Sequence, residues 1–293
     1  MDYMIVIRAV AVMAGTGLVL GILLAVASRK LAVQINPHVE AVLQVLPGSN
    51  CGACGFAGCE PAAEAMAEGH AGVNLCRAGG QEVANKVARV LGKDQVDVGV
   101  PEVATCRCSG GCKISAIRYD YHGVPKCSAA HALHGGPLVC QHGCTGFGDC
   151  VAACPFDAMV MGAEERPEII IDKCTGCGVC VQTCPMGPEG LLSLVDEGSP
   201  IVVACSSQES PKASRHACPR GCIACKMCEK VCPVDAIHVI DNLAVVDYEK
   251  CNGCGACVEK CPTECITLTR WAQPGGFPSE REVAEVTSAS ERR

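Results

Sequence analysis

Large aromatic side chains are scarce in this 293-residue sequence, which has four Phe, four Tyr and one Trp. Such side chains normally supply much of the buried area of a protein core. Chains with small cores are usually reinforced by disulfides or by bound metal. The scarcity therefore predicts that one of these reinforcements holds much of the protein together.

Motifs that would identify a nucleic-acid-binding protein or a catalytic chain are also missing. The formal net charge is -7 and no cluster of Lys and Arg is interleaved with aromatics, which excludes nucleic-acid binding. The sequence has no GxGxxG turn after a strand, no Walker loop, no C-x2-C-H haem site and no recognisable triad. The eight His are dispersed. We therefore expect no acid, base or nucleophile in this chain.

Cysteine is abundant, with 27 copies. A secreted disulfide scaffold would scatter its cysteines, but many here fall in tight C-x2-C-x2-C-x3-C-P runs. That spacing is typical of bacterial iron–sulfur proteins, whereas zinc ribbons usually pair two C-x2-C knuckles. The spacing favours [4Fe-4S] clusters, and the alternative is a structural zinc protein.

Residues 9–27 form a long uncharged apolar run near the N-terminus. The run is long enough to span a bilayer as a helix, and Arg29 and Lys30 follow it directly. A cleaved signal peptide is the alternative, because the AVA before Ser28 resembles a cleavage site, but the run exceeds the usual apolar length of such peptides. We predict a single retained anchor over residues 1–30 in the inner (cytoplasmic) membrane. The cluster domains are then expected on the cytoplasmic side, where reducing conditions suit thiolate ligands.

A first cysteine loop, CGACGFAGC, follows a short predicted helix with Asn36 as its N-cap and Pro37 as its first residue. Together with a later cysteine, this loop gives the spacing C-x2-C-x4-C-x16-C. Two more helical patterns follow, so we expect a small α-rich [4Fe-4S] domain over residues 31–92. Its predicted cluster ligands are Cys51, Cys54, Cys59 and Cys76.

Residues 93–139 form a connector whose cysteines lack regular spacing. A sixth cluster, buried free thiols and a mixture of the two all fit this segment. Four cysteines within 22 residues are difficult to explain as packing alone. Their density favours a cluster with the ligands Cys106, Cys108, Cys112 and Cys127.

The chain then repeats a unit of two cysteine loops and short apolar runs, over residues 140–200 and again over 201–270. In each unit a loop that ends in C-P precedes two predicted strands, a second cysteine loop and a closing strand. Both units resemble two-cluster bacterial ferredoxins. The expected fold class is α+β, with a transmembrane helix, an α-rich domain, a Cys-rich connector and two tandem ferredoxin-like units. The polar tail, residues 271–293, is expected to be mobile.

The ferredoxin resemblance implies crossed ligation, in which three cysteines of one loop share a cluster with the fourth cysteine of the other loop. In the second unit this gives the sets Cys222, Cys225, Cys228, Cys261 and Cys251, Cys254, Cys257, Cys232. In the first unit it gives one complete set, Cys174, Cys177, Cys180 and Cys154.

The remaining set lacks one cysteine, because Phe147 stands in the loop CTGFGDCVAACP where Cys177 stands in CTGCGVCVQTCP. Cys140 lies four residues before the first of these loops and is predicted to fill the missing corner. The resulting set is Cys140, Cys144, Cys150 and Cys184. The alternative leaves a three-cysteine centre and sends Cys140 to join Cys108, Cys112 and Cys127.

Two cysteines between the units repeat the spacing seen before the first unit. Cys218 lies four residues before Cys222, and Cys205 precedes Cys218 by 13, which is also the interval from Cys127 to Cys140. The recurrence supports a duplicated origin. The loop that follows Cys218 has no missing cysteine, so we interpret Cys205 and Cys218 as non-ligands or as a regulatory thiol pair.

Cys265 stands where the sibling loops have Ala158 and Ala236. A buried free cysteine behaves as a small hydrophobic side chain. We therefore interpret Cys265 as a packing residue and exclude it from the cluster ligands.

The order of anchor, CGACGFAGC domain, Cys-bearing connector and two ferredoxin-like units resembles the B subunit of the Rnf electron transport complex and of the similar Rsx complexes. The resemblance implies at least five [4Fe-4S] clusters, or six if the connector holds one. It implies an electron relay between soluble ferredoxin and the other membrane and peripheral subunits, in ferredoxin:NAD oxidoreduction coupled to Na+ or H+ translocation. The alternatives are a non-pumping reductase of a redox-sensing transcription factor and a freestanding membrane polyferredoxin.

Overall fold

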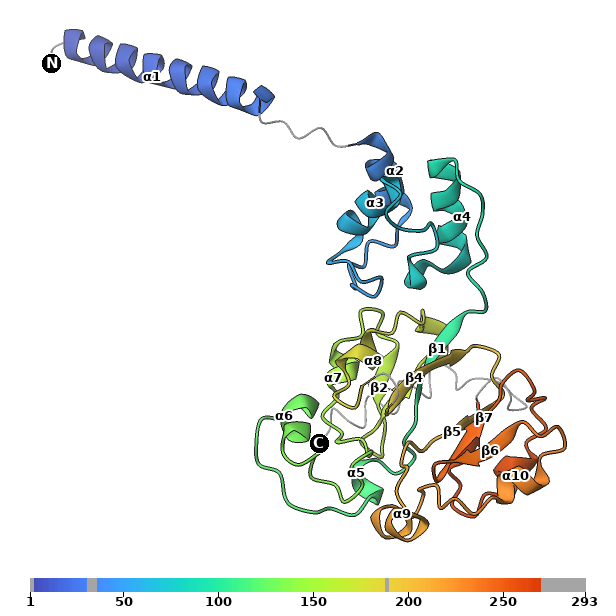
Figure 1. Ribbon diagram of the computed structural model, residues 1–293. Helices are drawn as coiled ribbons and strands as arrows, with labels where there is room; N and C mark the ends of the chain where they lie inside the picture. The colour runs from blue at the N-terminus through green and yellow to red at the C-terminus, as the bar shows by residue number, and fades with distance from the viewer. Residues whose placement is uncertain (1–2, 31–35, 188–189, 270–293) are drawn as a thin grey trace.

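The computed structural model describes residues 3–30, 36–187 and 190–269. Helix α1 (Tyr3–Lys30) is drawn away from the other elements in Figure 1. By length and composition its segment Val10–Lys30 can cross a membrane, and none of that segment is buried in the protein. The expectation of one apolar N-terminal helix is confirmed. The tail predicted to be mobile, residues 271–293, lies outside the described residues.

A small helical domain follows, made of α2 (Pro37–Val45), α3 (Cys59–Ala67), the 3-10 turn η1 (Arg77–Gly79) and α4 (Gly80–Leu91). The predicted N-cap is confirmed, because the side chain of Asn36 accepts a hydrogen bond from the backbone N–H of His38 at 3.0 Å. Val42, Met66 and Val87 are fully buried where the three helices meet. This packing positions the loop between α2 and α3, which carries Cys51 and Cys54 and leads into Cys59 at the start of α3.

The segment predicted as a connector contributes a strand to the first ferredoxin-like unit. Strand β1 (Glu102–Cys106) pairs antiparallel with β4 (Leu192–Asp196), with Ala104 opposite Leu194. Figure 1 shows the two strands side by side. The helices α5 (Gly111–Ile114) and α6 (Cys127–Ala132) follow β1 and pack beside that unit. The connector is therefore part of the unit rather than a spacer before it.

The two ferredoxin-like units have matching elements. The first contains α7 (Asp149–Ala152), β2 (Met159–Met161), β3 (Pro167–Ile169), the 3-10 turn η2 (Ile171–Lys173), α8 (Val179–Thr183) and β4. The second contains β5 (Ile201–Val203), α9 (Pro211–Ala217), α10 (Met227–Val231), β6 (Ile237–Ile240), β7 (Leu243–Val246), α11 (Ala256–Glu259) and β8 (Ile266–Leu268). The antiparallel pairs are β1 with β4 and β2 with β3, then β5 with β8 and β6 with β7. The predicted mixture of short helices and strands is confirmed.

Cysteines replace large apolar side chains in the cores of both units. Among the described residues, six of the eleven buried members of the first core are cysteines, and five of eleven in the second. The largest fully buried residues of these cores include Leu192 and Ile237. Such small cores need a further source of stability, which the sequence composition anticipated.

Glycines with a left-handed backbone shape the cysteine loops. In the second loop of the first unit, Gly176 has φ +61 and Gly178 has φ +79. A Cβ atom on Gly176 would collide with the carbonyl oxygen of Glu102 in β1, whereas one on Gly178 would make an ordinary contact with Leu194 at 3.6 Å. The loop therefore approaches β1 closely enough that only glycine fits at position 176.

We predict that Gly176→Ala lowers the free energy of unfolding more than Gly178→Ala does. Both substitutions place a side chain in left-handed backbone, at a cost of about 1–2 kcal/mol, but only the first also forces the loop away from β1. Guanidinium unfolding of the anaerobically purified full chain would measure the difference. Equal losses from the two variants would contradict the close approach.

Candidate metal centres

All 27 cysteines lie in the described part of the chain and carry free thiols. Within that part, no three His, Cys, Asp or Glu side chains are placed to bind a single metal ion. A tetrahedral zinc site would hold its sulfurs about 2.3 Å from one ion. The cysteines gather instead in wider groups of four, three of which line cavities. We name these groups A to F as they are described below.

Group A comprises the four cysteines predicted for the α-rich domain, Cys51, Cys54, Cys59 and Cys76. Burial raises the pKa of the Cys76 thiol, and the nearby thiols of the other three raise it further. Asn50, with φ 48, accepts a hydrogen bond from the backbone N–H of Cys59 at 2.8 Å. The Asn50 side chain thus joins the start of the loop to the start of α3.

Group B comprises Cys154, Cys174, Cys177 and Cys180, as the ferredoxin resemblance implies. Burial raises the pKa of Cys180 to about 11, and the three neighbouring thiols contribute to the rise. The backbone N–H of Ala158 donates to the sulfur of Cys154 at 3.4 Å. The fourth cysteine of one loop therefore lies with three cysteines of the other, and an N–H donor orients it.

Groups E and F lie in the second unit. Group E comprises Cys222, Cys225, Cys228 and Cys261, and group F comprises Cys232, Cys251, Cys254 and Cys257. Burial raises the pKa of Cys228 and of Cys257 to about 11 each, and neighbouring thiols of their own groups add to the rise. All four cysteines of group F line one cavity. Both groups have the crossed arrangement expected from the sequence.

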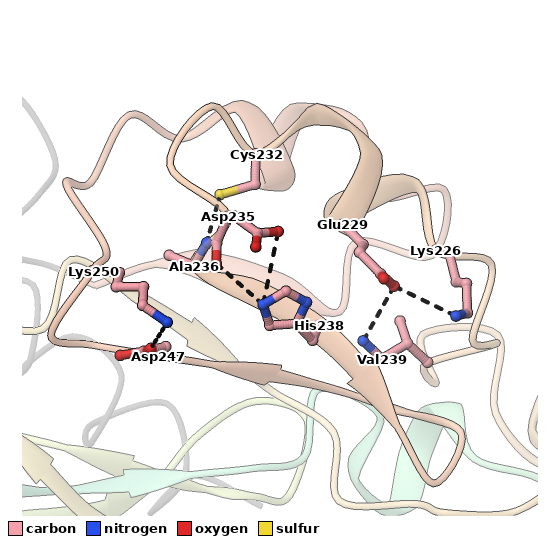
Figure 2. A network of polar contacts seen from close by, with 9 residues as sticks. All are labelled: Lys226, Glu229, Cys232, Asp235, Ala236, His238, Val239, Asp247 and Lys250. Carbon is pink, nitrogen blue, oxygen red and sulfur yellow. Dashed lines mark hydrogen bonds and ion pairs between the residues drawn. The ribbon is translucent and has the colours of Figure 1, made fainter.

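Polar contacts in the second unit fasten α10 to the strands beside it (Figure 2). The carboxylate of Glu229 accepts a hydrogen bond from the backbone N–H of Val239 at 3.4 Å and lies 3.7 Å from the Lys226 ammonium group. The sulfur of Cys232 accepts a hydrogen bond from the N–H of Ala236 at 3.2 Å. Donors to ligand sulfurs are among the features that set cluster potentials.

Group C contains Cys127 where the sequence predicted Cys140. Its members, Cys127, Cys144, Cys150 and Cys184, line one cavity. The carboxylate of Asp149, at the start of α7, accepts a hydrogen bond from the N–H of Cys127 at 3.0 Å. This bond fixes the start of α6 against the first cysteine loop. Phe147 takes no part in the group, because its ring packs against Tyr121 with the centroids 5.5 Å apart.

Cys140 lies in group D, together with two cysteines that the sequence analysis treated as non-ligands. The members Cys108, Cys140, Cys205 and Cys218 line one cavity. Burial raises the pKa of Cys140 to about 11, and the other three thiols add to the rise. Cys140 faces this cavity because Val139 donates to the carbonyl of Ala116 at 2.8 Å and because Gly143 closes a tight turn onto the carbonyl of Cys140 at 3.2 Å.

The four members of group D form two pairs of equivalent positions, Cys108 with Cys205 and Cys140 with Cys218. In each pair, one cysteine comes from the first ferredoxin-like unit and the other from the second. In the first unit, the N–H of Arg107 donates to the carbonyl of Leu191 at 2.7 Å, and Cys108 comes next. In the second, the N–H of Ala204 donates to the carbonyl of Cys265 at 2.7 Å, and Cys205 comes next. Cys140 and Cys218 likewise each precede the first cysteine of their loop by four residues. The recurring spacings were the sequence signal for this group.

Cys106 and Cys112 lie near Cys108, and Cys112 also lies near Cys127, but neither lines the cavity of group D or that of group C. The Cys106 thiol donates to the carbonyl of Cys108 at 3.8 Å, and the Cys112 thiol donates to the carbonyl of Cys144 at 3.2 Å. Burial raises the pKa of each to about 12. The set predicted for the connector is therefore divided, with Cys108 in group D and Cys127 in group C.

Cys265 lies against group E. Its sulfur is 3.6 Å from that of Cys261, and its side chain is 2% exposed. Hydrogen bonding with the Cys265 side chain, in which either thiol can be the donor, lowers the pKa of Cys261 to about 4 and also lowers the pKa of Cys222. The predicted packing residue therefore also contacts two cysteines of a group.

The six groups form one series in the order A, B, C, D, E, F. Each join brings a thiol of one group close enough to a thiol of the next to interact electrostatically. The joining pairs are Cys51 with Cys177, Cys180 with Cys150, Cys144 with Cys108, Cys205 with Cys222, and Cys228 with Cys257. The backbone N–H of Cys222 also donates directly to the sulfur of Cys205 at 3.3 Å.

Three family models match the cysteine loops. Residues 46–78 match a putative Fe-S cluster domain, and residues 140–188 match a 4Fe-4S dicluster domain. Residues 219–238 and 244–267 match a 4Fe-4S binding domain. Iron–sulfur and ferredoxin-type domains are therefore present, as the sequence predicted.

Curated proteins match most of the chain, and three of them are B subunits of ion-translocating complexes. The chain is 42% identical to that of the ion-translocating oxidoreductase complex of Methanosarcina acetivorans, over 90% of this chain and 98% of that protein. It is 44% identical to that of the proton-translocating ferredoxin:NAD(+) oxidoreductase complex of Clostridium ljungdahlii, over 89% and 92%. It is 39% identical to that of the Na(+)-translocating ferredoxin:NAD(+) oxidoreductase complex of Acetobacterium woodii, over 86% and 74%.

We predict that Asn50→Ala destabilises the α-rich domain by about 1–2 kcal/mol, because the N–H of Cys59 loses its acceptor and alanine fits left-handed backbone poorly. Asn50→Asp is the matched control, since it keeps an acceptor and tolerates the same backbone. Denaturation of the anaerobic full chain, followed by helical circular dichroism, measures the loss. The same loss in both variants would show that the Asn50 side chain does not hold the loop.

Proposed function

Because the chain belongs to the family of B subunits of Rnf-type ion-translocating ferredoxin:NAD oxidoreductases, which are the electron-relay subunits of these complexes, we propose that each of groups A to F holds one [4Fe-4S] cluster. A bound cluster of this kind accepts and releases single electrons. Six groups of four account for 24 of the 27 cysteines. Cys106, Cys112 and Cys265 are then the non-ligands.

The observation that carries this proposal is the continuity of the six groups. Group D supplies the join between the two ferredoxin-like units, through Cys108 beside Cys144 and through Cys205 beside Cys222. Electron transfer between centres requires short separations, and a series with a neighbour at every step meets that requirement. The family models leave Cys108, Cys205 and Cys218 outside the regions they match, so the support for group D comes from the geometry.

The chain's own residues hold the ligands and limit their contact with water. Most of the cysteines are buried or half-buried, and backbone N–H groups donate to the sulfurs of Cys154 and Cys232. Thiolates, not thiols, bind metal, and burial opposes their ionisation until the metal arrives. Cluster binding and the final packing of each unit are therefore coupled.

The two ends of the series face different partners in this proposal. Cys225 and Cys254 are exposed, which makes groups E and F the end that a soluble ferredoxin reaches. Group A lies in the domain that follows α1 and is the end nearest the membrane subunits. Matches over about 90% of the chain to subunits of ion-translocating complexes support this function over a freestanding polyferredoxin or a non-pumping reductase.

Iron and sulfide analysis tests the ligand groups. The anaerobic full chain is expected to contain about 24 iron atoms, against about 20 for five clusters. Cys205→Ala and Cys140→Ala should each remove one cluster, about four iron atoms, and the associated EPR intensity, while Cys106→Ala should keep the full content. Full iron content in Cys205→Ala, or loss of a cluster in Cys106→Ala, would overturn the assignment of group D.

Membrane vesicles test the orientation. We expect protease to cleave the cluster domains in sealed inside-out vesicles, because those domains lie on the cytoplasmic side. In right-side-out vesicles the same domains should be protected until detergent is added. Cleavage in intact right-side-out vesicles would reverse the orientation.

A further inference from the structure

Cys265 is a buried thiol in contact with two sulfurs of group E. It lies four residues after Cys261 and directly before β8. Its sulfur is 3.6 Å from that of Cys261, and its side chain also lies close enough to Cys222 to lower the pKa of that cysteine. Group E has four cysteines without it, so the contacts point to a role other than ligation.

The equivalent positions in the sibling loops lack this side-chain donor. Ala158 follows Cys154 by four residues, and Ala236 follows Cys232 by the same interval. Each of these alanines is buried and donates its backbone N–H to the cysteine sulfur, at 3.4 and 3.2 Å. Cys265 also donates its backbone N–H to Cys261. What Cys265 adds to the shared arrangement is therefore one S–H group.

The added S–H group favours negative charge on the sulfurs it faces. Cysteines that bind a cluster are thiolates and carry no proton, so the group that can donate a hydrogen bond here is the buried thiol of Cys265, 3.6 Å from the sulfur of Cys261. A one-electron reduction adds a negative charge to a cluster and its four thiolates. Hydrogen bonds to those sulfurs stabilise the more negative state and so raise the reduction potential.

We propose that Cys265 is a positioning residue that raises the reduction potential of the cluster held by group E above the value it would have with alanine at this position. This inference rests on the proposed function, in which group E binds a [4Fe-4S] cluster. The effect sets group E apart from group F, whose corresponding residue is Ala236. Group E adjoins Cys205 of group D, so the tuned centre lies at the junction between the two units.

An EPR-monitored redox titration of the anaerobic full chain tests the proposal. In Cys265→Ala, we expect the ratio of reduced to oxidised cluster at a fixed potential to drop about tenfold for one centre. This corresponds to a fall of about 59 mV in the midpoint potential of that centre, since one electron is transferred. Cys265→Ser keeps a donor in a side chain of similar size and should hold the midpoint near or above that of the wild type. Unchanged midpoints in Cys265→Ala, or equal falls in both variants, would overturn the donor role.

A variant with the opposite change completes the test. Ala236→Cys introduces a thiol at the matching position of group F and should raise a different midpoint. Iron content is measured on every sample, and about 24 atoms per chain are expected throughout. Full iron with unmoved midpoints would reject only this inference, whereas a wild-type chain short of one cluster would reject the proposed function instead.

Discussion

Sulfur coordination is the constraint on which the rest of this fold depends. The helices of the ferredoxin-like units, such as α7, α8 and α9, are four to seven residues long, and their sheets have two strands each. Helices that short and isolated two-stranded hairpins are marginal in water. Most buried cysteines of the two cores belong to the groups proposed to bind clusters, and Cys106 and Cys265 are the exceptions. In the proposed function, metal binding therefore contributes much of the folding free energy of these units.

The internal duplication explains where the cysteines outside the ferredoxin loops go. Strand β1 pairs with β4 in the first unit, and β5 pairs with β8 in the second. A cysteine of group D follows each of these strands, Cys108 after β1 and Cys205 after β5. Each unit also contributes the cysteine four residues before its first loop. Two copies of one element pair therefore meet around a shared cavity. The junction between the units is built from repeated parts rather than from a separate linker.

The sequence predicted the parts of the structure that depend on local spacing. The apolar helix, the Asn36 cap and the ferredoxin-type loops follow from short patterns, and groups A, B, E and F gather the cysteines expected of them. The membership of groups C and D did not follow, because it depends on contacts between distant segments. The pairing of β1 with β4 and the bond from Cys127 to Asp149 decide that Cys127, not Cys140, lies beside Cys144. The 13- and four-residue intervals were visible in the sequence, but the direction each cysteine faces was not.

The pairing of β1 with β4 has a consequence for biosynthesis. A ribosome releases residue 102 long before residue 196, so the first sheet cannot close until its unit is almost complete. The cysteine set of group D is completed later still, because Cys108 lacks its full set of neighbours until Cys218 has been synthesised. Group A is complete once Cys76 has been made. The cysteine sets of the proposed centres therefore become complete in a fixed order as the chain is synthesised, and Cys108 is made long before the last member of its group.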